Sequence, residues 1–224
     1  MHRGSRRFRI LVTWALLAVA GFARATSIPL GAVQIELPAP GGAHEISEQL
    51  PGFRQMIESI VPVSNRLLAL YAPDSVRNET NVARYMMVQS VKDFEGLDVS
   101  ASDFASVAAL SKAQMPSLDQ AMKDAGNSAA QKVSEAVSQQ TDANVDIKVG
   151  ESKVLGAYAD EKDWIGLSLM IAAQVTGDDE AAQPHSLICA ANTIRVRSRI
   201  LYVFVYSNYD SAADKSWTEA TSRA

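Results

Sequence analysis

The sequence predicts an α+β fold, with a central, mainly antiparallel sheet flanked by helices and a helical insertion in the middle of the chain. Three observations predict this class. Short segments with the alternation typical of strands occur near both ends of the chain. A stretch over residues 98–144 is rich in Ala, Ser and Gln and contains no β-rich run. The last five strand-like segments follow one another too closely for crossover helices, so we expect them to pair as antiparallel neighbours.

The first part of the chain is predicted to alternate strands with one short helix. Residues 33–37 alternate apolar and polar side chains, which predicts a strand ending in a Pro-Gly turn. Apolar residues recur at helical spacing over residues 53–60, and Pro62 ends that helix. Residues 66–72 and 82–91 predict two further strands.

The insertion is predicted to form three helical pieces with a thin apolar stripe. Ser100 with Asp103, or Ser102 alone, can cap the first piece. Pro116 suits the first turn of a second piece, and residues 126–127 (Gly-Asn) break it before the third. The side chains expected to face inward are Phe104, Val107, Ala108, Leu110, Leu118 and Met122.

Two roles for the insertion remain open. It can cover one face of the sheet, which we favour because Phe104 and Leu118 are expected to face inward. Alternatively, it can be a docking surface in which a helix lies in the groove of a partner.

In the last part of the chain apolar residues recur at every second position, which predicts five strands. A closing helix is expected after them. The last two strands are joined tightly at Arg197-Ser198. The closing helix, over residues 211–224, is expected to point Trp217 and Ala220 inward. The strands are expected over residues 145–149, 153–159, 164–175, 187–196 and 199–206.

The beginning of the chain predicts a cleavable export signal over residues 1–25. A head with four arginines precedes an apolar run of 13 residues, and small residues then occupy the −3 and −1 positions before a cleavage point after Ala25. A membrane-spanning helix needs ~20 apolar residues, so we expect export to the periplasm rather than anchoring, and no transmembrane segment in the mature chain. Residues 26–224 are expected to form a single domain. The start of a twin-arginine pattern at residues 5–7 leaves two export routes open, of which we favour general secretion.

Removal of this signal makes the chain strongly acidic. It leaves 16 basic and 25 acidic residues, a formal charge of −9 with His neutral. Such a surface repels nucleic acid and anionic lipid head groups, because binding either needs clustered Lys and Arg side chains, and this argues against nucleic acid as a partner. Cys189 is the only cysteine, so the chain has no intramolecular disulfide. Its apolar surroundings favour a buried, inert thiol; if it is exposed instead, an intermolecular disulfide is the leading alternative.

We find no convincing catalytic or metal-binding motif. His44 and His185 are far apart in segments expected to be loops, and they lack the spacing of metal ligands. Ser168 lies in Gly-Leu-Ser-Leu-Met, which has only the first half of an esterase elbow and is expected in the middle of a strand. We therefore expect no cofactor and lean against an enzyme.

One charged cluster is a candidate site. Arg195, Arg197 and Arg199 occupy alternate positions around a tight turn, where three guanidinium groups could contact an anion or an acidic partner. The alternative, which we favour, is that they keep the tip of a hairpin solvated.

Three segments and the closing helix resemble a known group of exported bacterial proteins. Residues 36–42 (ELPAPGG), 66–71 (RLLALY) and 201–206 (LYVFVY), followed by the helix with Trp217, are similar to proteins related to DcrB, which in turn resemble the PsbP extrinsic subunit of the photosystem. The resemblance implies an antiparallel sheet flanked by helices, in a protein that binds or supports others and catalyses nothing. It supplies no site residues.

Together with the export signal, this resemblance predicts a non-catalytic binding or envelope-support module. Its partner is expected to be an envelope protein or a small ligand. The alternative is a periplasmic hydrolase whose active-site residues are dispersed along the chain.

Overall fold

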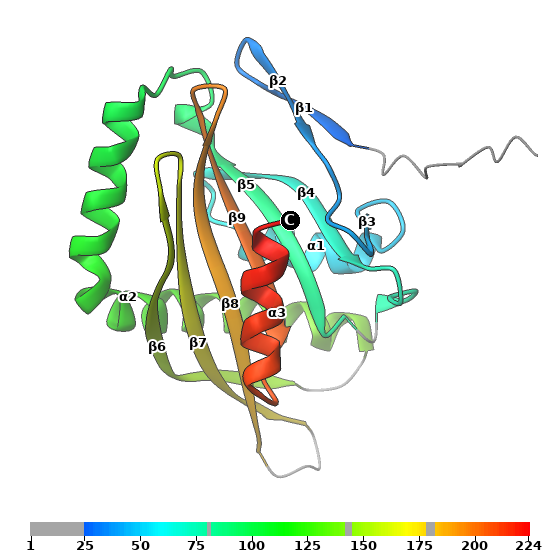
Figure 1. The fold of residues 1–224 in the computed structure, drawn as a ribbon. Helices are drawn as coiled ribbons and strands as arrows, with labels where there is room; N and C mark the ends of the chain where they lie inside the picture. Colours follow the sequence, from blue (N-terminus) through cyan, green and yellow to red (C-terminus); the bar gives the residue numbers. More distant parts are fainter. Residues whose placement is uncertain (1–24, 80–81, 142–144, 178–181) are drawn as a thin grey trace, which may run out of the picture.

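A computed structural model shows an antiparallel sheet with helices on both faces, which confirms the predicted α+β class (Figure 1). Within the described residues, seven strands form the main sheet in the order β3-β4-β5-β9-β8-β7-β6, and all neighbours are antiparallel. The export signal predicted at the start of the chain lies outside the described residues, except for Ala25. The structure describes residues 25–79, 82–141, 145–177 and 182–224.

The main sheet is accompanied by a separate hairpin of two strands, β1 and β2. The strands are β1 (Thr26–Leu30), β2 (Val33–Leu37), β3 (Ala43–Glu45), β4 (Asn65–Pro73), β5 (Arg84–Val91), β6 (Asp146–Glu161), β7 (Trp164–Thr176), β8 (Gln183–Val196) and β9 (Arg199–Asn208). The helices are α1 (Pro51–Ile60), the short 3₁₀ helix η2 (Lys92–Phe94), α2 (Ala101–Thr141) and α3 (Ala212–Ser222).

The two faces of the sheet carry different elements. We call them the α1 face, which α1 and the start of α2 cover, and the α3 face, which α3 and the β1–β2 hairpin cover (Figure 1). Successive side chains along β9 point alternately to the two faces. Phe204 and Tyr206 pack against the core under α1, whereas Val203 and Val205 belong to the core on the α3 face.

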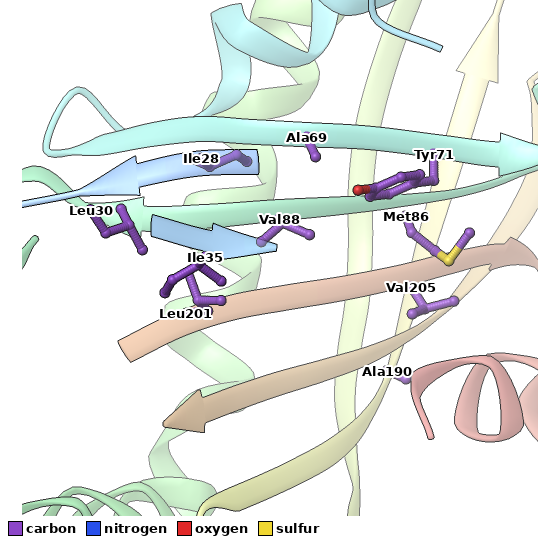
Figure 2. Packing of buried hydrophobic residues seen from close by; sticks show 10 residues of the cluster. All are labelled: Ile28, Leu30, Ile35, Ala69, Tyr71, Met86, Val88, Ala190, Leu201 and Val205. Carbon is purple, nitrogen blue, oxygen red and sulfur yellow. The ribbon is translucent and has the colours of Figure 1, made fainter. Parts of the chain in front are cut away.

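The β1–β2 hairpin closes the core on the α3 face. Figure 2 shows Ile28 and Leu30 from β1 and Ile35 from β2 over the sheet, and each is at most 6% exposed. Because these side chains leave water on folding, the hairpin is an integral part of the domain. The other buried members of this cluster are Ala69, Tyr71, Met86, Val88, Ala190, Leu201 and Val205.

Strand β1, like the short strand β3, is not predicted by the sequence pattern. Pro29 is unusual in a strand because it cannot donate a backbone hydrogen bond. It is tolerated here because it lies in a sheet of only two strands, opposite Gln34. Gly31 (φ +59°) makes the tight turn between β1 and β2.

Helix α2 is one continuous helix where three pieces were expected. The predicted cap is present, since Ser100 Oγ accepts from the Asp103 amide (3.1 Å) and Asp103 Oδ2 accepts from the Ser100 amide (3.0 Å). Pro116 lies inside the helix, and α2 changes direction sharply along its length (Figure 1), as proline-containing helices do. Gly126 is retained within it because a Cβ there would lie 3.0 Å from Val149 Cγ1.

Strand β6 is also one element where two were expected between residues 145 and 159. It lies at the edge of the sheet, and α2 runs beside it in the opposite direction. Polar side chains of α2 accept hydrogen bonds from the strand: Asp119 Oδ1 from the Val154 amide (2.8 Å) and Ser134 Oγ from the Ile147 amide (3.0 Å). The helix and the strand therefore support each other along their length.

Two side chains expected to face inward are exposed. Leu110 is 59% exposed on α2, and Ala220 is exposed on α3. On α3 the buried positions are instead Asp214 and Thr218. Asp214 is held at the sheet because its carboxylate accepts a hydrogen bond from Arg84 (2.8 Å). Trp217 packs against the core on this face, as expected, so this ion pair and one partly buried aromatic ring together set the rotation of the closing helix.

The role of α2 as a cover predicts a contrast between two of its residues. Phe104 is fully buried against Ile165, so Phe104→Ala should lower the free energy of unfolding by about 3–5 kcal/mol. Leu110→Ala, on the exposed side of the same helix, should change it by less than about 0.5 kcal/mol. Urea denaturation of both variants measures these changes in the free energy of unfolding. Equal, small losses would mean that α2 does not stabilise the sheet.

Candidate functional site

The arginines singled out in the sequence surround the turn between β8 and β9. Arg197 and Ser198 both have positive φ (49° and 62°), as the expected tight hairpin turn requires. Arg197 Nη1 donates to the carbonyl oxygen of Gln34 (2.9 Å). Arg195 Nε donates to Asp163 Oδ1 (2.7 Å). Both side chains thus link the turn to neighbouring hairpins.

Arg199 is the deepest of the three, at 4% exposed. A buried guanidinium needs acceptors for its N–H groups, and the chain supplies them. It donates to the carbonyl oxygens of Leu30 (3.3 Å) and Leu97 (3.1 Å), and it forms an ion pair with Asp98. All three arginines therefore have acceptors within the protein, and their contact with an anion or a partner stays a prediction.

A fourth arginine, Arg66 on β4, makes contacts in the same region. Arg66 Nε donates to Glu95 Oε1 (2.8 Å), and its Nη2 donates to the carbonyl oxygen of Pro29 (2.8 Å). Burial raises the pKa of Glu95, but hydrogen bonds from Arg66 and Ser90 outweigh it and hold that pKa below its usual value. Glu95 is therefore ionised at neutral pH and fixes the segment that follows β5.

These contacts bring four turns together at the upper end of the sheet in Figure 1. A Cβ on Gly31 would lie 2.8 Å from the carbonyl oxygen of Glu95, so only glycine allows these turns to approach so closely. The Val99 amide donates to the carbonyl oxygen of Ser198 (2.9 Å). We call this region the loop end, and it consists of residues 31–32, 62–64, 92–99 and 197–198.

The loop end exposes three large apolar side chains. Val63 is 89% exposed, Phe94 is 50% exposed and Leu97 is 54% exposed. Among the described residues, only two other large apolar side chains are exposed, Leu110 on α2 (59%) and Leu155 on β6 (37%). Large apolar side chains gathered in water mark interaction surfaces. The loop end is therefore the candidate functional site.

Backbone and side-chain bonds hold these residues in place. Lys92 Nζ donates to the carbonyl oxygen of Val63 (2.8 Å), and the Lys92 amide donates to that of Ser64 (2.9 Å). The Leu97 amide donates to the carbonyl oxygen of Phe94 (3.1 Å). The patterns in the sequence do not single out these residues. For Phe94 and Leu97 the available signal is the run KDFEGLD (residues 92–98), in which single apolar residues stand among charged ones in a turn, and Val63 has no comparable signal.

His44 and His185 lie in strands rather than in the expected loops. His44 lies in β3, where its ring nitrogens contact Asp74 Oδ1 (3.2 Å) and Gln49 Oε1 (2.7 Å). His185 is exposed on β8. Across the part of the chain that the structure describes, no group of three or more His, Cys, Asp or Glu side chains is arranged to hold a metal ion.

Ser168 lies within β7, as the sequence predicts, and is 2% exposed. Its Oγ donates to Glu219 Oε1 (2.5 Å), which also accepts from Lys215 Nζ (2.5 Å). Burial raises the pKa of Glu219, but these two hydrogen bonds outweigh it and keep that pKa below its usual value. A low carboxyl pKa makes Glu219 a weak base. This contact attaches α3 to the sheet.

A larger buried network, not foreseen from the sequence, also attaches α3. Asn192 is 2% exposed, and its Oδ1 accepts from the Tyr158 hydroxyl and from Trp164 Nε1 (2.8 Å). Its Nδ2 donates to Ser222 Oγ (3.2 Å). The Arg223 guanidinium lies over both aromatic rings, 5.6 Å and 5.0 Å from their centroids. These polar groups are satisfied within the protein.

Comparison with family models, with curated proteins and with solved structures finds no match to this chain. The resemblance to the DcrB and PsbP groups therefore stays a prediction. Within the described residues, no helix combines the length and the apolar composition needed to span a membrane.

Removing the buried guanidinium should loosen the loop end. Arg199→Ala leaves the carbonyl groups of Leu30 and Leu97 without their donor, so we expect a loss of about 2–4 kcal/mol in unfolding free energy. Arg197→Ala removes one exposed bond and should cost less than about 1 kcal/mol. Urea denaturation measures both variants. Similar costs for the two would contradict the structural role of Arg199.

The single thiol should be inert in the folded protein. Cys189 is 1% exposed, as expected, and burial raises its pKa to about 12, so almost no thiolate exists near pH 8. A disulfide-exchange reagent should label it at least about a hundredfold faster in denaturant than in buffer. Rapid labelling without denaturant, or a disulfide-linked dimer, would show that the thiol is accessible.

Proposed function

We propose that this chain is an exported periplasmic protein with a non-catalytic binding or support role at the cell envelope, and that it binds through the loop end. The export signal predicted from the sequence supports the location. The resemblance to DcrB-related proteins supports the role. The observation that carries the proposal is the exposure of Val63, Phe94 and Leu97 on adjacent turns.

The loop end is suited to binding because it is held rigidly. Arg199 and Arg66 fix the segment of residues 92–99 through bonds to Leu97 and Glu95. A surface that is ordered before binding loses less conformational entropy when its partner arrives. Burial of the apolar side chains against a partner therefore stabilises the complex, and little conformational entropy is lost on binding.

Site-specific photo-crosslinking in exporting cells tests this function. A photoreactive amino acid at position 94 should give crosslinked envelope species, because Phe94 lies in the proposed contact. The same amino acid at position 110 is the matched control, since Leu110 is similarly exposed but lies on α2. Fractionation of the same cells checks that the chain reaches the periplasm.

Two results would contradict the proposal. Equal crosslinking from positions 94 and 110 would show that the loop end has no special role. Crosslinking from position 110 alone would favour the other role considered for the insertion, a helix that docks into a partner.

A further inference from the structure

We infer that the partner of the loop end is a lipid surface, and that Val63, Phe94 and Leu97 insert into the interfacial region between its headgroups and acyl chains. This inference rests on the proposed binding role and gives it a partner of definite chemistry. Four features of the loop end support it: the placement of the apolar side chains, the pairing of the backbone beneath them, the local charge and the small size of the surface.

The apolar side chains project from turns at one end of a rigid sheet. Val63 follows α1, whereas Phe94 and Leu97 follow β5, and the backbone bond from Lys92 to Ser64 holds the two turns together. Side chains on adjacent turns can enter the same plane without any change in the sheet. Binding at a lipid boundary needs only a shallow apolar face of this kind.

The backbone carbonyl groups of the three residues that would insert already have partners. The carbonyl oxygens of Val63 and Leu97 accept from Lys92 and Arg199, at 2.8 Å and 3.1 Å. The carbonyl oxygen of Phe94 accepts from the Leu97 amide. Unpaired backbone groups are costly in a lipid environment, and these groups would enter it paired. Lys92 has a long apolar stem that can lie along the boundary while its amine stays at the headgroups.

The charge of the loop end differs from that of the rest of the chain. Glu95 and Asp98 are neutralised by Arg66 and Arg199. The remaining charged side chains of the four turns are Lys92, Arg197 and Asp93, which sum to +1. The mature chain as a whole carries −9. An anionic lipid surface would therefore repel the acidic rest of the protein, so that the loop end is turned toward the lipid.

The small size of the loop end favours lipid over a folded protein partner. Its four turns contain 15 residues, whereas a stable protein interface uses about 20–30 residues on each side. A lipid surface needs no matching shape, so a few inserted side chains are enough for reversible binding.

Vesicle co-sedimentation tests the inference. The protein is purified from exporting cells with its natural processing and mixed with vesicles of phosphatidylcholine, alone or with an equal part of phosphatidylglycerol. We expect the unaltered protein to bind these vesicles and to sediment with them. The double variant Phe94→Ser/Leu97→Ser should partition about tenfold less, because it removes most of the inserted apolar surface.

The matched control is Leu110→Ser/Leu155→Ser, which removes the same kind of exposed side chain elsewhere and should bind as the unaltered protein does. Thermal melting confirms that both variants are folded. Failure of the unaltered protein to bind either vesicle, or an equal loss in both variants, overturns the lipid inference. If crosslinking from position 94 then identifies an envelope protein, the proposed function stands with a protein partner; if it identifies nothing, both proposals fail.

Discussion

The buried guanidinium of Arg199 is the interaction on which the loop end depends. It begins β9, and it donates to the β1–β2 hairpin through Leu30 and to the segment before α2 through Leu97. These acceptors are 169 and 102 positions away in the chain. A charged group so deeply buried is stable only when such acceptors are in place, so the three segments must adopt their positions together. The fold of the hairpin, the entry to α2 and the exposed apolar turns are thus coupled through one side chain.

Much of the fold follows from periodicity in the sequence. The helix before Pro62 and the tight turn at Arg197-Ser198 are present in the structure, and so are the strands of the second half, although two of the five expected ones are joined in β6. The errors occur where tertiary contacts override local preference. Pro116 and Gly126 indicate helix ends, yet contact with β6 keeps α2 continuous through both. No local signal in the sequence reports that contact.

The candidate site was harder to predict than the fold. Arg195, Arg197 and Arg199 stand out because they alternate around a turn, but their acceptors lie far away in the sequence and cannot be read from local spacing. Phe94 and Leu97 lack any period that would mark them as core or surface. Their exposure follows from the pairing of Lys92 with the turn after α1, which only the assembled structure shows.

The pairing of α2 with β6 has a consequence for the behaviour of the protein at high concentration. A strand at the edge of a sheet offers unpaired backbone groups as a template for strands of other molecules. Side-chain oxygens of Asp119 and Ser134 accept hydrogen bonds from two of these backbone groups. Helix α2 therefore protects the edge of the sheet from pairing with other molecules, besides packing against the sheet. Partial unfolding that lifts α2 would open this template while the rest of the sheet stays intact. Aggregation through β6 would then begin before global unfolding, and colloidal stability would follow the attachment of α2 rather than the melting temperature of the domain.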